Sequence, residues 1–192
     1  MKARLSVLAT ICVAAILSAC GDPTSLRATL GNFDDTLTVF ALSGTPPSYP
    51  SGVSIVARQA VRVDGFASFD FAVDIDDNGN VVLLPVNLVV SSIGGTHRVG
   101  LQKVPGAFAD VLEAPKTGYD TTAAVVLAPG EVAVIEAAHN GGSDVCGFAL
   151  SPFLYAKIGV DSLSLASRTI HLHTVFDPNC GFRSFADGIP TS

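Results

Sequence analysis

Residues 69–76 show the clearest alternation in the chain. The odd positions hold large apolar residues and the even positions are mainly acidic: Phe69, Phe71, Val73 and Ile75 against Asp70, Ala72, Asp74 and Asp76. A period of two predicts a β-strand with one buried face and one acidic face in water. Residues 77–80, Asp-Asn-Gly-Asn, follow directly and carry the Asn-Gly hairpin signal. The chain is therefore expected to turn there and return as a strand over 81–90, with a bulge or an edge position at Pro85.

The rest of the chain shows the same preference for strands. After residue 19 it has only three glutamates and three lysines, whereas Val, Thr, Phe and Ile, which favour strands, are frequent. One short helix is expected over 107–114, where Phe108, Val111 and Leu112 have helical spacing before Pro115. Strands are predicted at 26–30, 36–42, 53–63, 69–76, 81–90, 97–104, 122–127 and 131–137, and two or three final strands over 153–160, 162–166 and 169–176.

About nine or ten short strands joined by frequent turns predict an all-β domain. We expect an antiparallel two-sheet β-sandwich with at most one short helix, and a closed β-barrel is the alternative. Two further turns are predicted, a hairpin at 128–130 (Ala-Pro-Gly) and a turn at Ser167-Arg168.

The first twenty-two residues carry a different signal. Lys2 and Arg4 precede an apolar run over 5–17, which is too short to span a bilayer and is typical of a secretory signal peptide. The ending Leu17-Ser18-Ala19-Cys20 resembles the lipobox of bacterial lipoproteins. That resemblance implies cleavage before Cys20 and acylation of its thiol. The expected organisation is a signal peptide over 1–19, a lipidated tether over 20–25 and one domain over 26–192.

The resemblance also implies where the protein resides. The expected location is the bacterial cell envelope, with the protein held to the membrane through its lipid. Gly21 directly after the acylated cysteine favours the outer membrane in a diderm bacterium. Asp22 lies one place beyond the position at which an aspartate usually retains a lipoprotein in the inner membrane. Acyl chains of this kind suffice for stable anchoring.

Four cysteines occur in the chain. Cys12 belongs to the apolar run and Cys20 is the expected lipid site, which leaves Cys146 and Cys180. In an exported protein such a pair predicts a disulfide, here closing a loop of about 35 residues. A metal pair or a nucleophilic thiol is the alternative interpretation, although no Cys-x-x-Cys spacing accompanies the pair.

The charge balance restricts the class of partner. Loss of Lys2 and Arg4 with residues 1–19 leaves 9 basic against 17 acidic residues, a side-chain charge of about −8. Proteins that bind nucleic acid rely on clustered Lys and Arg to neutralise phosphates, so nucleic acid is not expected as a partner. Adhesion to anionic lipid by charge alone is disfavoured for the same reason.

The acidic turn offers a candidate calcium site. Residues 74–80 resemble the opening of an EF-hand loop, with Asp74, Asp76 and Asn78 as oxygen ligands. Pro85 stands where that loop needs a bidentate glutamate, and the flanking residues alternate like strands rather than helices. A plain hairpin turn is the preferred interpretation, and Ca²⁺ binding is the alternative.

Two histidines offer a second candidate metal site. His171 and His173 lie on one face of a predicted strand, opposite an apolar face, and are expected to point to solvent. Two imidazoles do not complete a metal site, so a third ligand would have to come from His97, His139 or an aspartate elsewhere in the chain.

No motif for catalysis is recognisable in the chain. There is no Gly-x-Ser-x-Gly, Ser-x-x-Lys or His-Glu-x-x-His pattern. We therefore expect a non-enzymatic binding or structural module on a lipid anchor, with no required cofactor and with another envelope protein or a glycan as partner. The alternative is an envelope hydrolase or metal-dependent enzyme whose site is assembled from distant His and Asp residues.

Overall fold

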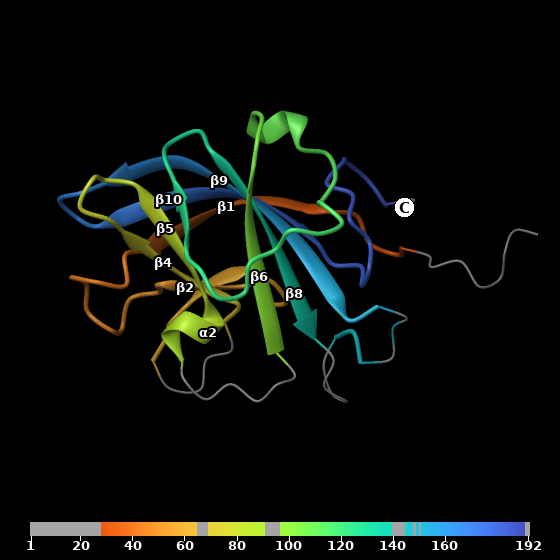
Figure 1. Ribbon diagram of the computed structural model, residues 1–192, viewed down its shortest axis with the longest axis horizontal. Helices are drawn as coiled ribbons and strands as arrows, with labels where there is room; N and C mark the ends of the chain where they lie inside the picture. The colour runs from red at the N-terminus through yellow and green to blue at the C-terminus, as the bar shows by residue number, and fades with distance from the viewer. Residues whose placement is uncertain are drawn as a thin grey trace, which may run out of the picture.

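The computed structural model describes residues 28–64, 69–90, 97–139, 145–147, 149 and 151–190. They form two five-stranded antiparallel sheets packed as a β-sandwich, as predicted, and the barrel alternative is wrong (Figure 1). The first sheet has the order β1-β10-β9-β8-β6 and the second β3-β2-β4-β5-β7. The strands are β1 (Phe33–Phe40), β2 (Gly52–Ser54), β3 (Gln59–Val61), β4 (Phe71–Ile75), β5 (Val81–Pro85), β6 (His97–Val104), β7 (Val125–Leu127), β8 (Val132–His139), β9 (Phe153–Ser164) and β10 (Thr169–Asp177).

The first sheet is covered on both faces. Along β8, Ala133, Ile135 and Ala137 face the main core between the sheets. Val132 and Val134 face a second apolar cluster, which includes Tyr155 and Phe185. Every residue of β8 is buried, because the alternating side chains of this strand enter two separate cores. Val111 and Ala114 from the segment 105–120, together with Phe185, cover the outer face.

The predicted hairpin at residues 77–80 joins β4 to β5. Gly79 has a φ of 80°, which suits glycine, and Asp76 Oδ1 accepts hydrogen bonds from the backbone N–H groups of Asn78 and Asn80. The prediction that Asp70 lies on a face in water is wrong: this residue is only 1% exposed. It lies directly before β4, at the end of the β4–β5 hairpin opposite the turn, where the two sheets meet.

The two helical segments differ from the prediction in place or in length. Strand β5 ends at Pro85, which pairs with Phe71 of β4 but lies beyond the residues that pair with β7, so the expected edge position is found there. The helix α2 (Val86–Val89) replaces the second half of the predicted strand. Proline has no N–H for the ladder, which favours a break there. The helix expected over 107–114 is only the 3-10 turn η1 (Phe108–Asp110). No helix among the described residues is long and apolar enough to cross a bilayer.

Four other parts of the chain differ from the prediction. The turn at 128–130 forms, with Glu131 N–H bonded to the Ala128 carbonyl, but it makes no hairpin. Strand β7 pairs with β5, whereas β8 pairs with β6 and β9, so this turn connects the two sheets. Residues 53–63 divide into β2 and β3, and residues 153–166 merge into β9. The expected strand at 26–30 is not found over 28–30, and its first two residues lie outside the described residues.

The predicted disulfide between Cys146 and Cys180 is confirmed, with its Cα atoms 5.7 Å apart. It ties the segment after β8 to the C-terminal turn. Beside it, Asn179 accepts hydrogen bonds from the backbone N–H groups of Thr29 and Leu30 and donates to the Leu30 carbonyl. The start of the described chain is therefore fixed next to the disulfide. Cys20 and the expected tether over 20–25 lie outside the described residues.

Asp177, at the end of β10, should make stability depend on pH. The side chain is buried, Oδ2 has no hydrogen-bond partner among the described residues, and burial raises its pKa to about 6 despite hydrogen bonds from Asn179. A raised pKa in the folded state means that this contribution is complete below about pH 4 and is lost as the pH rises through about 6. The loss amounts to about 3 kcal/mol, at 1.36 kcal/mol per pKa unit.

The substitution Asp177→Asn should remove this part of the pH dependence. Urea unfolding at several pH values between 4 and 7 gives the free energy of unfolding of the wild type and of Asp177→Asn, and the slopes of these energies against pH are then compared. Asp77→Asn is the matched control, because Asp77 is exposed and should leave the slope unchanged. If the free energy of unfolding has the same dependence on pH in the wild type and in Asp177→Asn, the pKa of the Asp177 carboxyl is not raised by folding.

Candidate metal centre

Three side chains from distant parts of the sequence meet at one end of the sandwich. His97 begins β6 and His139 ends β8, and the two residues are direct partners across these antiparallel strands. Their ring centroids are 4.9 Å apart. Asp70 reaches them from the second sheet, and its carbonyl accepts a hydrogen bond from the N–H of Val86 in α2. In Figure 1 these ends of β6 and β8 lie on the same side as α2.

Both imidazoles hydrogen-bond the same carboxylate oxygen. Asp70 Oδ1 lies 2.8 Å from Nε2 of His97 and 3.1 Å from Nε2 of His139. The other oxygen, Oδ2, accepts a hydrogen bond from the backbone N–H of Ile55 at 2.6 Å. The backbone N–H of Asp70 donates to Val53 at 2.8 Å. Each of these bonds fixes the carboxylate, so Oδ1 is held facing the two histidines.

The carboxyl group of Asp70 is ionised despite its burial. Burial raises its pKa, but hydrogen bonds from His139, His97 and Ile55 and the charge of His139 together hold it below its ordinary value. An ionised carboxylate only accepts hydrogen bonds, so each Nε2 carries a hydrogen when it bonds Oδ1. Displacement of those hydrogens exposes two nitrogen lone pairs directed at a buried anionic oxygen.

The geometry fits a divalent transition metal. The ligand atoms of Asp70, His97 and His139 all lie within 4.8 Å of one another. A tetrahedral Zn²⁺ with bonds near 2.0–2.1 Å places its ligand atoms about 3.3 Å apart. The observed N–O separations of 2.8 and 3.1 Å therefore need to lengthen by only a few tenths of an ångström. Two imidazoles and one carboxylate form a ligand set that suits zinc and iron(II).

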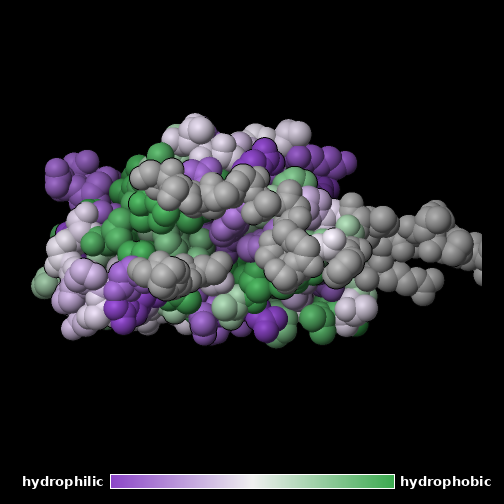
Figure 2. All heavy atoms as spheres, turned by 90° about the horizontal axis from the view of Figure 1, so that it is seen from below, coloured by the Kyte–Doolittle hydropathy of each residue, from purple (hydrophilic) through white to green (hydrophobic). Residues whose placement is uncertain are grey.

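Solvent reaches this cluster mainly at His97. The side chain of His97 is 19% exposed, against 9% for His139 and 2% for Asp70. Figure 2 views the molecule from the side that carries α2 and shows hydrophobic residues gathered over part of this face. Exposed apolar residues there include Leu88 and Val90, at the end of α2. The low exposure of Asp70 and His139 limits competition from water at the cluster.

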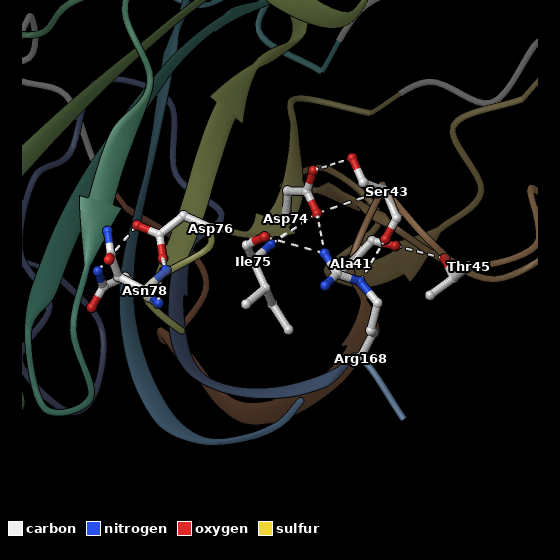
Figure 3. A network of polar contacts seen from close by, with 9 residues as sticks. Ala41, Ser43, Thr45, Asp74, Ile75, Asp76, Asn78 and Arg168 are labelled. Atoms are coloured by element: carbon white, nitrogen blue, oxygen red, sulfur yellow. Dashed lines mark hydrogen bonds and ion pairs between the residues drawn. The ribbon is translucent and has the colours of Figure 1, made fainter. Parts of the chain in front are cut away.

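The residues of the candidate calcium site are engaged in other contacts (Figure 3). Asp74 accepts hydrogen bonds from Ser43 Oγ at 2.6 Å and from the guanidinium of Arg168 at 3.0 Å. The hydrogen bonds of Asp76 stay within its own turn, to Asn78 and Asn80. The structure does not bring Asp74, Asp76 and Asn78 together around one point, and calcium binding there stays a prediction.

The two histidines of β10 lie apart from His97 and His139. Strand β9 separates β10 from β8, so His171 and His173 are on a different part of the first sheet. His171 Nδ1 is 3.1 Å from Thr38 Oγ1, and His173 Nε2 is 2.7 Å from Asp34 Oδ1. Both are partly exposed, on the face opposite Ile170 and Leu172, as the alternation predicted. Neither takes part in a group of three metal ligands among the described residues.

Sequence reasoning missed the Asp70, His97 and His139 cluster. Asp70 was assigned to a face in water, and the two histidines each stand alone in the sequence. His97 and His139 were expected only as possible third ligands beside His171 and His173, and no sequence motif links them to Asp70. No protein-family model, curated protein sequence or solved structure matches this chain.

Proposed function

We propose that this chain is a lipid-anchored envelope protein whose β-sandwich binds one divalent transition metal ion through Asp70, His97 and His139. The observation that carries the metal site is the convergence of two Nε2 atoms on one oxygen of a buried carboxylate. The lipid anchor follows from the lipobox resemblance at Leu17-Ser18-Ala19-Cys20. The metal-binding module would be displayed close to the membrane, where another envelope protein or a glycan is the expected partner.

The ligand set is more consistent with an open site than with a closed structural one. Structural zinc sites usually have four protein ligands, whereas three protein ligands leave a position for water or substrate. The exposure of His97 places that position on the solvent side of the cluster. A metal there would acidify a bound water, which makes metal-dependent hydrolysis the second candidate function. In such a reaction the protein itself would hold the two imidazoles in place and exclude bulk water from the metal site.

Zinc binding to the full chain in detergent tests this function. Competition against a chromophoric chelator should give one Zn²⁺ per chain, and Co²⁺ should report the ligand set in its visible spectrum. His97→Ala or His139→Ala removes one metal ligand and should weaken zinc binding at least about 100-fold. Loss of a residue that only hydrogen-bonds a ligand already weakens metal binding by up to about 100-fold, and loss of the ligand itself should cost no less. Zinc should also raise the melting temperature of the wild type.

His171→Ala is the matched control, because it removes an imidazole outside the cluster. Its zinc affinity should equal that of the wild type. Equal affinity for His97→Ala, His139→Ala and His171→Ala would contradict the assignment, since the metal would then bind elsewhere. Calcium titration of the same preparation examines the candidate site at Asp74, Asp76 and Asn78 independently.

A further inference from the structure

A second group of reactive side chains lies on the outer face of the first sheet. A pocket of about 300 Å³ opens there between β1, β9 and β10 on one side and η1 with the C-terminal segment on the other. Polar and aromatic residues that line it are Asp34, Phe108, Lys157, His173, Phe185 and Asp187. None of these belongs to the candidate metal centre, so the two sites are independent.

Lys157 contributes a buried amine to this pocket. The residue is only 3% exposed, in the middle of β9, and its neighbours Ala156 and Ile158 face the main core on the opposite side of the sheet. Its Nζ donates hydrogen bonds to the backbone carbonyls of Phe108 at 2.8 Å and Val111 at 3.0 Å. Among the described residues, no carboxylate forms a salt bridge with it.

These contacts suit the neutral form of the amine. A neutral amine has two N–H groups and one lone pair, whereas an ammonium has three N–H groups. The two carbonyls satisfy both N–H groups of the neutral form. Burial lowers the pKa of Lys157, although the charges of Asp34 and Asp187 act in the opposite direction. The centroid of the Phe108 ring is 4.1 Å from Nζ, and a cation–π interaction with this ring also favours the ammonium. Nucleophilic lysines in proteins are nevertheless usually ones that burial removes from water.

A group able to carry protons lines the same pocket. His173 lies on the same face of the sheet as Lys157, because His173 pairs with Gly159 and Lys157 pairs with Val175 across β9 and β10. Its Nε2 lies 2.7 Å from Asp34 Oδ1, and with Nε2 as the donor to this carboxylate, Nδ1 is the nitrogen that can accept a proton. The Phe108 ring stacks on His173 with centroids 4.0 Å apart and covers Gly159. The pocket thus combines an amine, a carboxylate-supported imidazole and an apolar wall.

We propose that Lys157 forms an imine with a small aldehyde or ketone bound in this pocket, with His173 as the proton carrier. Asp34 and Asp187 disfavour an anionic ligand, so the substrate class is an uncharged carbonyl compound. The Nζ lone pair forms a bond to the carbonyl carbon while the carbonyl π electrons move to oxygen. A proton passes from nitrogen to that oxygen through His173, and loss of water leaves the C=N bond. The step needs no oxidant or reductant.

Trapping with acetaldehyde and cyanoborohydride, followed by peptide mass mapping, tests the proposal on the full chain in detergent. Lys103 and Lys116 are exposed and serve as internal controls. Burial lowers the pKa of Lys157 and so leaves more of its amine neutral at pH 7, which means that Lys157 should be ethylated several-fold faster than Lys116. In denaturant the three lysines should react equally. A folded protein in which Lys157 reacts no faster than Lys116 would overturn the proposal.

Two variants separate the amine from the proton carrier. His173→Gln should slow ethylation of Lys157 several-fold and leave Lys103 and Lys116 unchanged, whereas an unchanged rate would remove His173 from the proposal. His171→Gln, on the same strand but outside the pocket lining, is the control and should leave the rate as in the wild type. Zinc should bind equally well before and after trapping, since the pocket does not depend on the metal centre.

Discussion

Replacement of Asp70 by alanine is expected to lower the free energy of unfolding by about 3–5 kcal/mol, the usual cost of removing one partner from a buried charged group. The carboxylate accepts hydrogen bonds from His97, His139 and the backbone N–H of Ile55. Its loss leaves the Ile55 N–H and the ring of His139 buried without an acceptor, and each such group costs about 1–3 kcal/mol. The two sheets also lose a polar connection at this end.

Urea unfolding followed by circular dichroism measures this effect, since the chain has no tryptophan. A chelator in the buffer keeps the result independent of metal binding. Asp70→Asn keeps the shape and one acceptor oxygen but places an N–H group opposite Ile55, so a smaller loss of about 1–3 kcal/mol is expected. Asp161→Ala, on an exposed part of β9, is the control and should change the stability by less than about 0.5 kcal/mol. If Asp70→Ala lowered the free energy of unfolding as little as the control Asp161→Ala, the cluster would not be a buried ionic network.

Removal of the disulfide in the double variant Cys146→Ala, Cys180→Ala is expected to cost about 3–4 kcal/mol. The two cysteines are 34 residues apart in the sequence, and the chain-entropy model gives this value for a loop of that length. Cys146 is also buried in the main core, so loss of its sulfur removes packing contacts. The segment at Thr29 and Leu30 should loosen as well, because Asn179 holds it beside Cys180.

Unfolding of the wild type with and without a thiol reductant provides the comparison for this variant. The reduced wild type and the double variant should have similar midpoints, both below that of the oxidised protein. Hydrogen exchange at the backbone amides of Thr29 and Leu30 should become faster in the double variant. Equal midpoints for oxidised and reduced protein would show that the C-terminal turn is held by its hydrogen bonds alone.

Zinc binding and imine formation would serve different purposes in the molecule. The candidate metal centre joins the two sheets at the α2 end, whereas Lys157 lies on the outer face of the first sheet under η1. Neither set of ligands contacts the other among the described residues. Each can therefore be removed by substitution without loss of the other, and the two proposals succeed or fail separately.

The local part of the fold was predictable from the sequence. The alternation over 69–76 and the Asn-Gly turn give β4, β5 and their hairpin, because side-chain period and turn chemistry are properties of a few adjacent residues. The scarcity of Glu and Lys indicated an all-β domain for a similar reason. The cysteine count predicted the pair Cys146 and Cys180, since only two cysteines remained after the N-terminal segment.

The choice of partners across the molecule depended on the tertiary structure. The turn at 128–130 has the same local chemistry whether it makes a hairpin or connects the two sheets, and only the core decides between them. Asp70 lies 27 residues from His97 and 69 from His139 in the sequence, so no motif joins them. Lys157 and His173 likewise become neighbours through strand pairing. The class of fold, the main hairpin and the disulfide thus follow from adjacent residues and composition, whereas the pairing of strands and sheets selects which polar side chains meet.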